Sequence, residues 1–409
     1  MPPINVAAAN LSLTLLAGLC LAAWGYLLAV HGGFWRADQR LGKKTSDREA
    51  WPDVAAIIPA RDEAATIGAA VESHRRSAYP GALRVILVDD GSTDGTADLA
   101  RGAFEDAGRL GEDSGPRRLA IVTAPPLAEG WSGKVAAMDE GLRAAEAEAP
   151  DAAFLLFTDA DIRHGPDALA RLVEKALRDG CALVSLMARL DARGPWAGWL
   201  IPAFVYFFQM LYPMRRVNDP TDAMAAAAGG CALVNRRALE EAGGLAPIGA
   251  ALIDDCALAR LIKGEPPARR IWLGHGTTVV SGRDNRSLGS IWSMVARTAF
   301  TQLNYSADLL TLTVLGLALV FLAGPLAFLT APLHGDVLAM ALGGAAWAAM
   351  ALSFGPTLRL YGKPSIDGLL LPAAAALYLA MTISSALNHW RGEGGRWKGR
   401  TYARPDAEN

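Results

Sequence analysis

Four long stretches without a charged side chain constrain this chain more than any other feature of its sequence. One is at the N-terminus and three are near the C-terminus: residues 1–30, 309–333, 337–358 and 368–388. A helix needs about 20 apolar residues to span a bilayer, and each stretch is long enough. The composition agrees, with 52% hydrophobic residues and a mean hydropathy of +0.21. We therefore expect an N-terminal transmembrane anchor over residues 1–31 and about three transmembrane helices within residues 309–388.

The first stretch is predicted to be an uncleaved anchor rather than a signal peptide, because residues 1–10 contain no Lys or Arg. The basic residues follow it instead: Arg36, Arg40, Lys43, Lys44 and Arg48. Positive charge marks the cytoplasmic side of a membrane protein, so the domain after the anchor is expected in the cytoplasm.

The C-terminal tail, residues 389–409, conflicts with this arrangement. Three spans would carry the tail to the outside, yet it is basic. Its basic residues are Arg391, Arg396, Lys398, Arg400 and Arg404. Either one of the three stretches is re-entrant or the charge rule fails here, and the sequence leaves both open.

An aromatic and apolar stretch over residues 196–214 interrupts the polar middle of the chain, and Arg215 and Arg216 follow it. This pattern favours a helix that lies in the membrane interface with its rings at headgroup depth. A core helix of a soluble domain is the alternative.

From Trp51 to about Arg286, apolar segments of strand length alternate with helical segments. Strands are predicted at residues 54–58, 84–88, 119–122 and 152–157, and helices at residues 66–76, 96–106 and 134–147. This alternation predicts an α/β domain with a mostly parallel sheet that is covered on both faces. The net charge of −2 gives no electrostatic reason to expect nucleic acid as a partner. The four cysteines have no zinc-type spacing, so we expect reduced core thiols.

Acidic residues follow three of the four predicted strands. Asp62 and Glu63 follow the first, Asp90 follows the second, and Asp159 and Asp161 follow the fourth. Sheets of this kind bind ligands at the carboxyl ends of their strands. Carboxylates that lie together repel one another unless a cation or ligand compensates them. The Asp159-Ala160-Asp161 motif therefore predicts Mg²⁺ or Mn²⁺ bridging a sugar diphosphate, because hard cations prefer oxygen ligands.

Two further motifs are candidates for the same site. Lys134 begins a predicted helix, a position that favours phosphate binding, although a solvated surface lysine is the alternative. Asp254 and Asp255 lie in apolar surroundings, which raise carboxylate pKa values and suit a general base. The alternative is an acidic pair at a helix N-terminus.

Several other kinds of site are excluded. An EF-hand loop beginning at Asp90 would need a Glu where Arg101 stands, and His275 fits a structural role better than a catalytic one. The glycine signature of dehydrogenases and the nucleophile elbow of α/β-hydrolases are both missing from the sequence.

Taken in order, these motifs resemble glycosyltransferase family 2. The matching pieces are Ile57-Ile58-Pro59-Ala60-Arg61-Asp62-Glu63, Val88-Asp89-Asp90-Gly91-Ser92-Thr93-Asp94, Gly130-Trp131-Ser132-Gly133-Lys134, Asp159-Ala160-Asp161 and Asp254-Asp255. The resemblance covers about residues 53–305. It implies a GT-A fold, which is a Rossmann-like nucleotide-sugar domain, over residues 51–305, with the 196–214 helix inside it.

The resemblance also implies roles for single residues. The donor would be bound by Pro59, Arg61, Asp62, Glu63, Asp90, Lys134 and Asp159, with Asp62 and Asp90 on the nucleobase side. Asp159 and Asp161 would hold the metal and the diphosphate. Asp255, next to Asp254, would deprotonate the acceptor hydroxyl for inverting transfer, and Arg297 would stabilise the diphosphate. Two positions depart from the family pattern, which commonly has Asn at position 62 and Glu at position 254.

A finer resemblance links the chain to the hopene-associated glycosyltransferases. It rests on residues 297–303, the single N-terminal anchor, the C-terminal spans and Trp397-Lys398-Gly399-Arg400. That branch, which resembles ceramide glucosyltransferase in layout, implies a bacterial inner (plasma) membrane protein that transfers one sugar to a membrane lipid, with a hopanoid as the candidate. A processive polysaccharide synthase is an alternative, but only Arg297 and Gln302 lie where its Gln-x-x-Arg-Trp motif belongs. A non-catalytic nucleotide-sugar-binding membrane protein is the other alternative, and the full set of carboxylates counts against it.

Overall fold

The computed structural model describes residues 6–42, 48–110, 117–264, 268–392, 396–397 and 400–401. The chain divides into two compact units, which are described separately. An α/β unit consists of Asp38–Asp191 and Arg216–Asp284, together with the part of the C-terminal tail from Arg396 onward. A helical unit consists of Met1–Ala37, Ala192–Arg215 and Asn285–Gly395.

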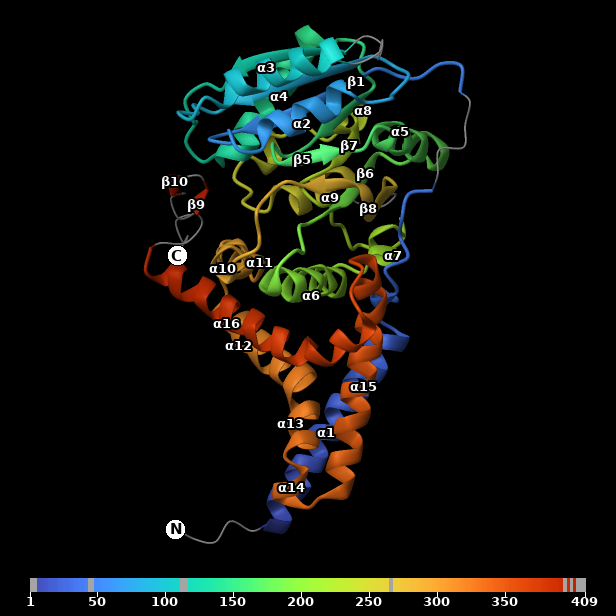
Figure 1. Cartoon of the computed structure of the whole chain (residues 1–409), viewed down its shortest axis with the longest axis vertical. Helices are drawn as coiled ribbons and strands as arrows, with labels where there is room; N and C mark the ends of the chain where they lie inside the picture. The colour runs from blue at the N-terminus through green and yellow to red at the C-terminus, as the bar shows by residue number, and fades with distance from the viewer. Residues whose placement is uncertain are drawn as a thin grey trace. The chain divides into compact units, whose positions relative to one another are not determined.

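The α/β unit is built on one mixed sheet, which has eight strands within the described residues (Figure 1). The strands are β1 (Val54–Ala60), β2 (Leu83–Asp89), β3 (Arg117–Thr123), β4 (Phe154–Phe157), β5 (Ile162–His164), β6 (Leu183–Arg189), β7 (Ala232–Asn235) and β8 (Ile271–Ser281). Their order is β3-β2-β1-β4-β7-β6-β8-β5. The half from β3 to β4 is parallel, as the sequence predicts. Beyond β4 the sheet is mixed, because β7 runs antiparallel to both β4 and β6 and β5 runs antiparallel to β8.

Helices cover both faces of the parallel half. The helices of this unit are α2 (Ile67–Arg75), α3 (Thr96–Leu110), α4 (Gly133–Glu148), α5 (Ala168–Asp179), α8 (Arg236–Glu241), α9 (Asp254–Lys263) and the short η2 (Ala246–Ile248), and α7 (Met214–Val217) lies where the chain passes between the units. Alternate residues of a strand point to opposite faces, so an apolar run such as β1 packs on both sides. Val54, Ala56 and Ile58 join a core with α2, α3 and α5. Ile57 faces α4, where a side chain at Gly141 would meet it.

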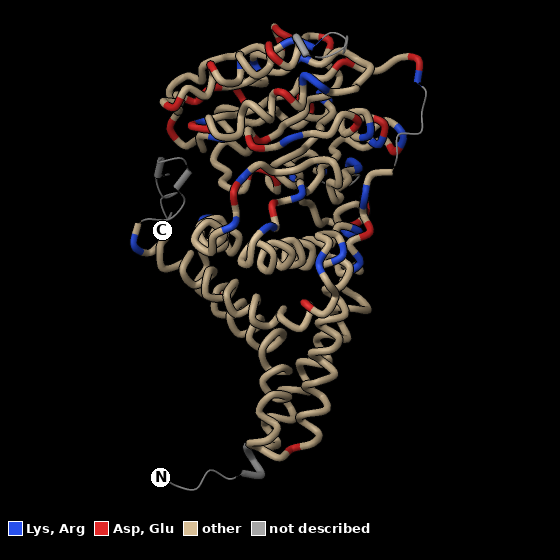
Figure 2. Tube along the Cα trace, in the orientation of Figure 1, with Lys and Arg blue, Asp and Glu red and all other residues tan. Residues whose placement is uncertain are grey.

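The helical unit contains four segments long and apolar enough to cross a membrane: Asn10–Ala29, Ala307–Leu329, Val337–Leu360 and Ser365–Trp390. Its elements are α1 (Val6–Ala29), η1 (Phe34–Arg36), α6 (Pro195–Leu211), α10 (Leu288–Ala296), α11 (Ala299–Gln302), α12 (Ala307–Leu317), the π-helical η3 (Ala318–Ala323), α13 (Gly324–Leu329), α14 (Ala331–His334), α15 (Val337–Leu360), η4 (Ser365–Leu370) and α16 (Leu371–Trp390). Figure 2 shows that charged residues are concentrated in the α/β unit and are nearly absent from α1 and from α12 to α15. The fold class is therefore a mixed α/β domain accompanied by one N-terminal and three C-terminal apolar helices.

The two units divide the chain differently from the sequence-based domain boundaries. The helix predicted at residues 196–214 is α6, and it belongs to the helical unit, as do α10 and α11. Tyr206 of α6 packs against Phe34 and Phe354, and its hydroxyl is 2.5 Å from Ser353 Oγ of α15. An almost wholly apolar helix buries most surface against other apolar helices, which agrees with the place of α6 in this unit. The domain bounds of residues 51–305 stay a prediction.

Candidate active site

The loops after β1 and β2 are joined by hydrogen bonds into one structure. Both strands end at the same level, because Ala60 pairs with Asp89. The Asp62 amide donates to Ser92 Oγ (3.0 Å), and Asp62 Oδ1 accepts from the Thr93 amide (2.9 Å). Asp62 has a φ of 49°, a left-handed conformation that Asn and Asp tolerate better than most residues. The carboxylates predicted after the two strands therefore lie in one rigid rim.

Arg61 and Asp90 form the inner part of this rim. The Arg61 guanidinium donates to the backbone carbonyl of Asp90, and its Nη1 lies 3.6 Å from Asp90 Oδ2. The Asp90 side chain is buried. It borders a cavity of about 180 Å³, which residues 124–128, Trp131 and the inner side of α4 complete.

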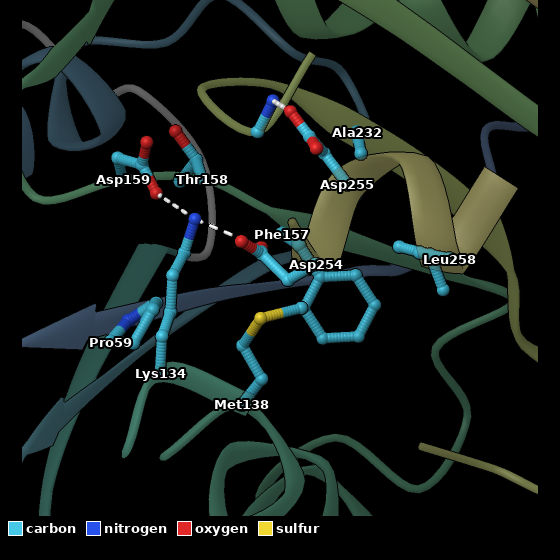
Figure 3. Close-up of a pocket in the computed structure, with 11 residues that line it drawn as sticks. Pro59, Lys134, Met138, Phe157, Thr158, Asp159, Ala232, Asp254, Asp255 and Leu258 are labelled. Carbon is cyan, nitrogen blue, oxygen red and sulfur yellow. Dashed lines mark hydrogen bonds and ion pairs between the residues drawn. The ribbon is translucent and has the colours of Figure 1, made fainter. Parts of the chain in front are cut away.

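Lys134 joins two carboxylates, one that follows β4 and one at the start of α9 (Figure 3). It stands in the first turn of α4, which Ser132 caps by accepting from the Val135 amide. Its Nζ lies 2.8 Å from Asp159 Oδ1 and 2.9 Å from Asp254 Oδ2. Burial alone would lower the pKa of Lys134, but Asp159 and Asp254 outweigh it and raise the pKa above its ordinary value. Lys134 is therefore a charged member of the cluster, and the surface-lysine alternative does not hold.

The Asp159-Ala160-Asp161 motif follows β4 directly. While Asp159 faces Lys134, Asp161 Oδ2 accepts a hydrogen bond from Ser281 Oγ (2.5 Å) at the end of β8. Burial and then the charge of Asp159 raise the pKa of Asp161. Within the described part of the chain, no three Asp, Glu, His or Cys side chains come together as a metal site.

Asp255 lies in the first turn of α9, beside Asp254. Its Oδ2 accepts from the Gly229 amide (2.8 Å) and its Oδ1 from the Cys256 amide (2.7 Å). Burial and then the charge of Asp254 raise the pKa of Asp255 to about 6, although Lys134 opposes the rise. The pKa of Asp255 is therefore above the ordinary range of a carboxyl group, which suits a proton acceptor.

The cluster surrounds a small cavity of about 10 Å³, enough for about one water molecule. Figure 3 shows Lys134, Asp159, Asp254 and Asp255 around it, with Pro59 and Met138 on the apolar side. The structure thus brings together Pro59 and four of the predicted polar residues. The rim that carries Arg61, Asp62, Glu63 and Asp90 forms a second group at the carboxyl ends of β1 and β2. Arg297 is not among them, because it lies at the end of α10 in the helical unit.

Several supporting groups were not predicted from the sequence. Ser281 and the Gly229 amide hold Asp161 and Asp255. Thr158 donates to the Gly230 carbonyl (2.8 Å), so its oxygen accepts from His164 Nε2, 3.0 Å away. These residues come from β5, β8 and the loop before β7, which the sequence pattern did not reveal.

Comparison with known proteins agrees with this geometry. Residues 55–243 match the family model for Glycosyl transferase family 2. A segment of 58 residues is 48% identical to succinoglycan biosynthesis protein ExoU of Rhizobium meliloti, and it covers 14% of this chain and 16% of that protein.

Among solved structures, the chain is similar to mannosyltransferase PcManGT from Pyrobaculum calidifontis in complex with GDP-Man and Mn²⁺. The TM-score is 0.50 at 20% identity, over 92% of this chain and 99% of that one. Glucosyl-3-phosphoglycerate synthase from Mycobacterium tuberculosis, in complex with Mn²⁺ and UDP-glucose, gives a TM-score of 0.36 at 20% identity, over 64% and 85% of the two chains.

The α/β unit accordingly has a GT-A-like fold. Residues 55–243 of this unit are similar to glycosyl transferase family 2, and the chain also has helices of membrane-spanning length.

Proposed function

We propose that this protein is a membrane-bound glycosyltransferase that transfers one sugar, with inversion, from a nucleotide sugar to a lipid acceptor. The observation that carries the proposal is the cluster in which Lys134 joins Asp159 and Asp254, next to Asp255. Lys134 and Asp159 lie in the segment that matches the family 2 model, and the acidic pair follows that segment. A base, a cation and an acidic pair at the carboxyl edge of a sheet are the groups that sugar transfer from a diphosphate requires.

The donor is proposed to lie along the rim, with its nucleobase in the 180 Å³ cavity beside Asp90. Lys134 and Asp159 then lie toward the diphosphate. Asp159 and Asp161 fit Mg²⁺ or Mn²⁺, because such ions use one or two protein carboxylates and complete their shell with phosphates and water. Burial and then the charge of Asp159 raise the pKa of Asp161, and a bound cation would offset both effects. When bound, the ion would neutralise negative charge on the departing diphosphate.

Asp255 is proposed to accept the proton of the acceptor hydroxyl. The hydroxyl oxygen then forms a bond to the anomeric carbon of the sugar while the bond from that carbon to the diphosphate oxygen breaks. Attack from the side opposite the leaving group inverts the configuration. Arg297 is proposed to stabilise the diphosphate on family resemblance alone.

The acceptor is proposed to be a membrane lipid because of how the chain connects its units. Before its C-terminal tail, the chain crosses four times between the α/β unit and the unit of apolar helices. The crossings follow Ala37, Asp191, Arg215 and Asp284. A catalytic domain that is connected to membrane helices at four points stays at the membrane surface. This restraint is useful if the acceptor is a membrane lipid and unnecessary if the acceptor is soluble. A hopanoid with a hydroxylated side chain is the specific acceptor that we propose, on the resemblance to one branch of the family.

Purified protein incubated with radiolabelled nucleotide sugars and bacterial lipid extract should transfer label into the organic phase. Extract from a hopanoid-deficient strain should support no transfer if the acceptor is a hopanoid. Label found only in water-soluble products contradicts the lipid acceptor. A product of many sugars would identify a polysaccharide synthase, and donor binding without turnover would identify a non-catalytic binding protein.

Lys134→Met should weaken donor binding about 10-fold or more, because hydrogen bonds to charged groups contribute about 1.5–3 kcal/mol each. It should also move the acid limb of the kcat/KM profile to higher pH, since Lys134 lowers the pKa of Asp255. Calorimetry with the nucleotide sugar and a pH series measure the two effects.

Lys175→Met is the matched control for this variant. Lys175 also forms an ion pair, with Asp179 at 2.6 Å, but on the outer helix α5. This control should bind and turn over like the wild type. If Lys134→Met keeps both wild-type affinity and the wild-type pH profile, Lys134 has no role in donor binding.

A further inference from the structure

The helical unit has two distinguishable ends. At one end the start of α1 meets the turn between α14 and α15, where Asn10 Nδ2 donates to the His334 carbonyl and Thr14 Oγ1 to Asp336 Oδ2 (3.3 and 2.5 Å). We name this the turn end. At the other end α6 meets the ends of α1 and α15. His31 Nε2 is 2.7 Å from the Met210 carbonyl, and Gln209 donates to Thr357 (3.1 Å). We name this the α6 end.

Three segments run between these ends. α1 and α15 run from the turn end to the α6 end, and the stretch from α12 to α13 runs back (Figure 1). Its start lies at the α6 end, because Gln302 Nε2, just before α12, donates to the Tyr212 hydroxyl just after α6 (2.6 Å). The chain leaves the α/β unit a few residues before α6 begins and re-enters it a few residues after α6 ends. α6 and the α/β unit therefore belong to the same side of a bilayer.

The segment after α15 turns back along that helix. Trp347 Nε1 donates to the Leu369 carbonyl of η4 (3.1 Å), and a side chain at Gly368 would lie 2.5 Å from the Ala351 carbonyl. An α-helix rises about 1.5 Å per residue, so Ala351 lies about 14 Å and Trp347 about 20 Å before the end of α15. The hydrocarbon core is about 30 Å thick, so η4 descends only part of the way toward the turn end.

α16 then returns to the α6 end. Tyr378 donates to the Leu200 carbonyl of α6 (2.9 Å), and Ser385 Oγ accepts from the Phe300 amide (3.0 Å). Trp390, the last residue of α16, packs on Phe300 with ring centres 5.6 Å apart. In Figure 1, α16 runs across the axes of α1 and α15 rather than beside them.

We infer that η4 and α16 form a re-entrant limb that enters and leaves the same membrane leaflet. The protein then crosses the membrane three times, and its C-terminal tail lies on the same side as the α/β unit. The partner of this limb is the lipid of one leaflet. Its large exposed side chains are apolar, including Ile366 (68% exposed) and Leu370 (50%), whereas Asp367 of η4 is half-buried. Trp390 (53%) ends the limb with a ring suited to the interface. The inference rests on the proposed membrane location and not on the proposed reaction.

A re-entrant limb also removes the conflict over charge. With three crossings, the basic tail and the basic residues after α1 lie on one side, as the positive-inside rule requires. With α16 as a fourth crossing, they would lie on opposite sides.

Thiol labelling of single-cysteine additions tests the limb, because all four native cysteines are buried. The additions are Glu105→Cys in α3, Leu333→Cys at the turn end and Asn409→Cys in the tail, none of which alters the basic residues. Intact cells receive a membrane-impermeant maleimide, and each variant is labelled again in detergent to show that its thiol is reactive. We expect residues 105 and 409 to be protected together in intact cells and residue 333 to be labelled.

The decisive observation is whether the labelling of residue 409 in intact cells matches that of residue 105 or that of residue 333. This comparison does not depend on the orientation of the protein in the membrane. If residue 409 labels with residue 333 and apart from residue 105, α16 crosses the membrane and the inference is wrong. If all three residues label alike, the membrane location itself is wrong. Sugar transfer by the same variants is measured separately, so a failed reaction leaves the topology result intact.

Discussion

Asp255→Asn should lower kcat by about 100-fold or more, the range expected when a general base is lost. The amide keeps the shape of the side chain, and its oxygen still accepts from the Gly229 amide, but it takes up no proton at neutral pH. Donor affinity measured by calorimetry should stay within a few-fold of the wild type, because the donor is proposed to contact Lys134 and Asp159 instead. Asp179→Asn, in the outer helix α5, is the control and should be fully active.

The pH profile of the wild type gives a second measurement of the same group. The pKa of Asp255 is raised to about 6, so the residue is increasingly protonated as the pH falls through 6. A base acts only when deprotonated, and kcat/KM should therefore fall with a slope of one proton below about pH 6. This limb should disappear in Asp255→Asn. Wild-type turnover in that variant would rule out Asp255 as the base.

Removal of the divalent cation should lower activity by about 100- to 1000-fold, since a metal ion contributes several kcal/mol of charge stabilisation in the transition state. EDTA should abolish transfer, and added Mn²⁺ or Mg²⁺ should restore it. Asp161→Ala should lose donor binding and turnover together, and excess metal should not rescue it. Ser281→Ala removes the hydrogen bond to Asp161 and the one that Ser281 Oγ accepts from the Arg283 amide (3.2 Å). It should retain most activity and regain the rest at high metal concentration.

Full wild-type activity in excess EDTA would remove the metal from the mechanism. Loss of turnover in Asp161→Ala with unchanged donor affinity would give this residue a role other than holding the diphosphate.

The parts of this protein that follow from local sequence were predicted well. The first four strands and the first three helices of the α/β unit lie within a few residues of their predicted bounds. Each strand is an apolar run that stops at polar turn residues, and such signals need no knowledge of the rest of the chain. The apolar helices were also predicted, because length and composition alone decide whether a helix suits a bilayer.

Tertiary structure alone decided the rest, because it depends on contacts between distant segments. Lys134 and Asp254 are far apart in the sequence, and they meet only because the mixed half of the sheet brings the start of α9 back to the end of β4. The sequence marked each as a candidate but gave no reason to pair them. The sequence pattern of α6 favours an interfacial helix over a core helix of the soluble domain, and its packing on α15 placed it in the helical unit. Hydropathy shows that α16 is apolar, whereas its direction is set by Tyr378, Ser385 and Trp390 packing at the α6 end.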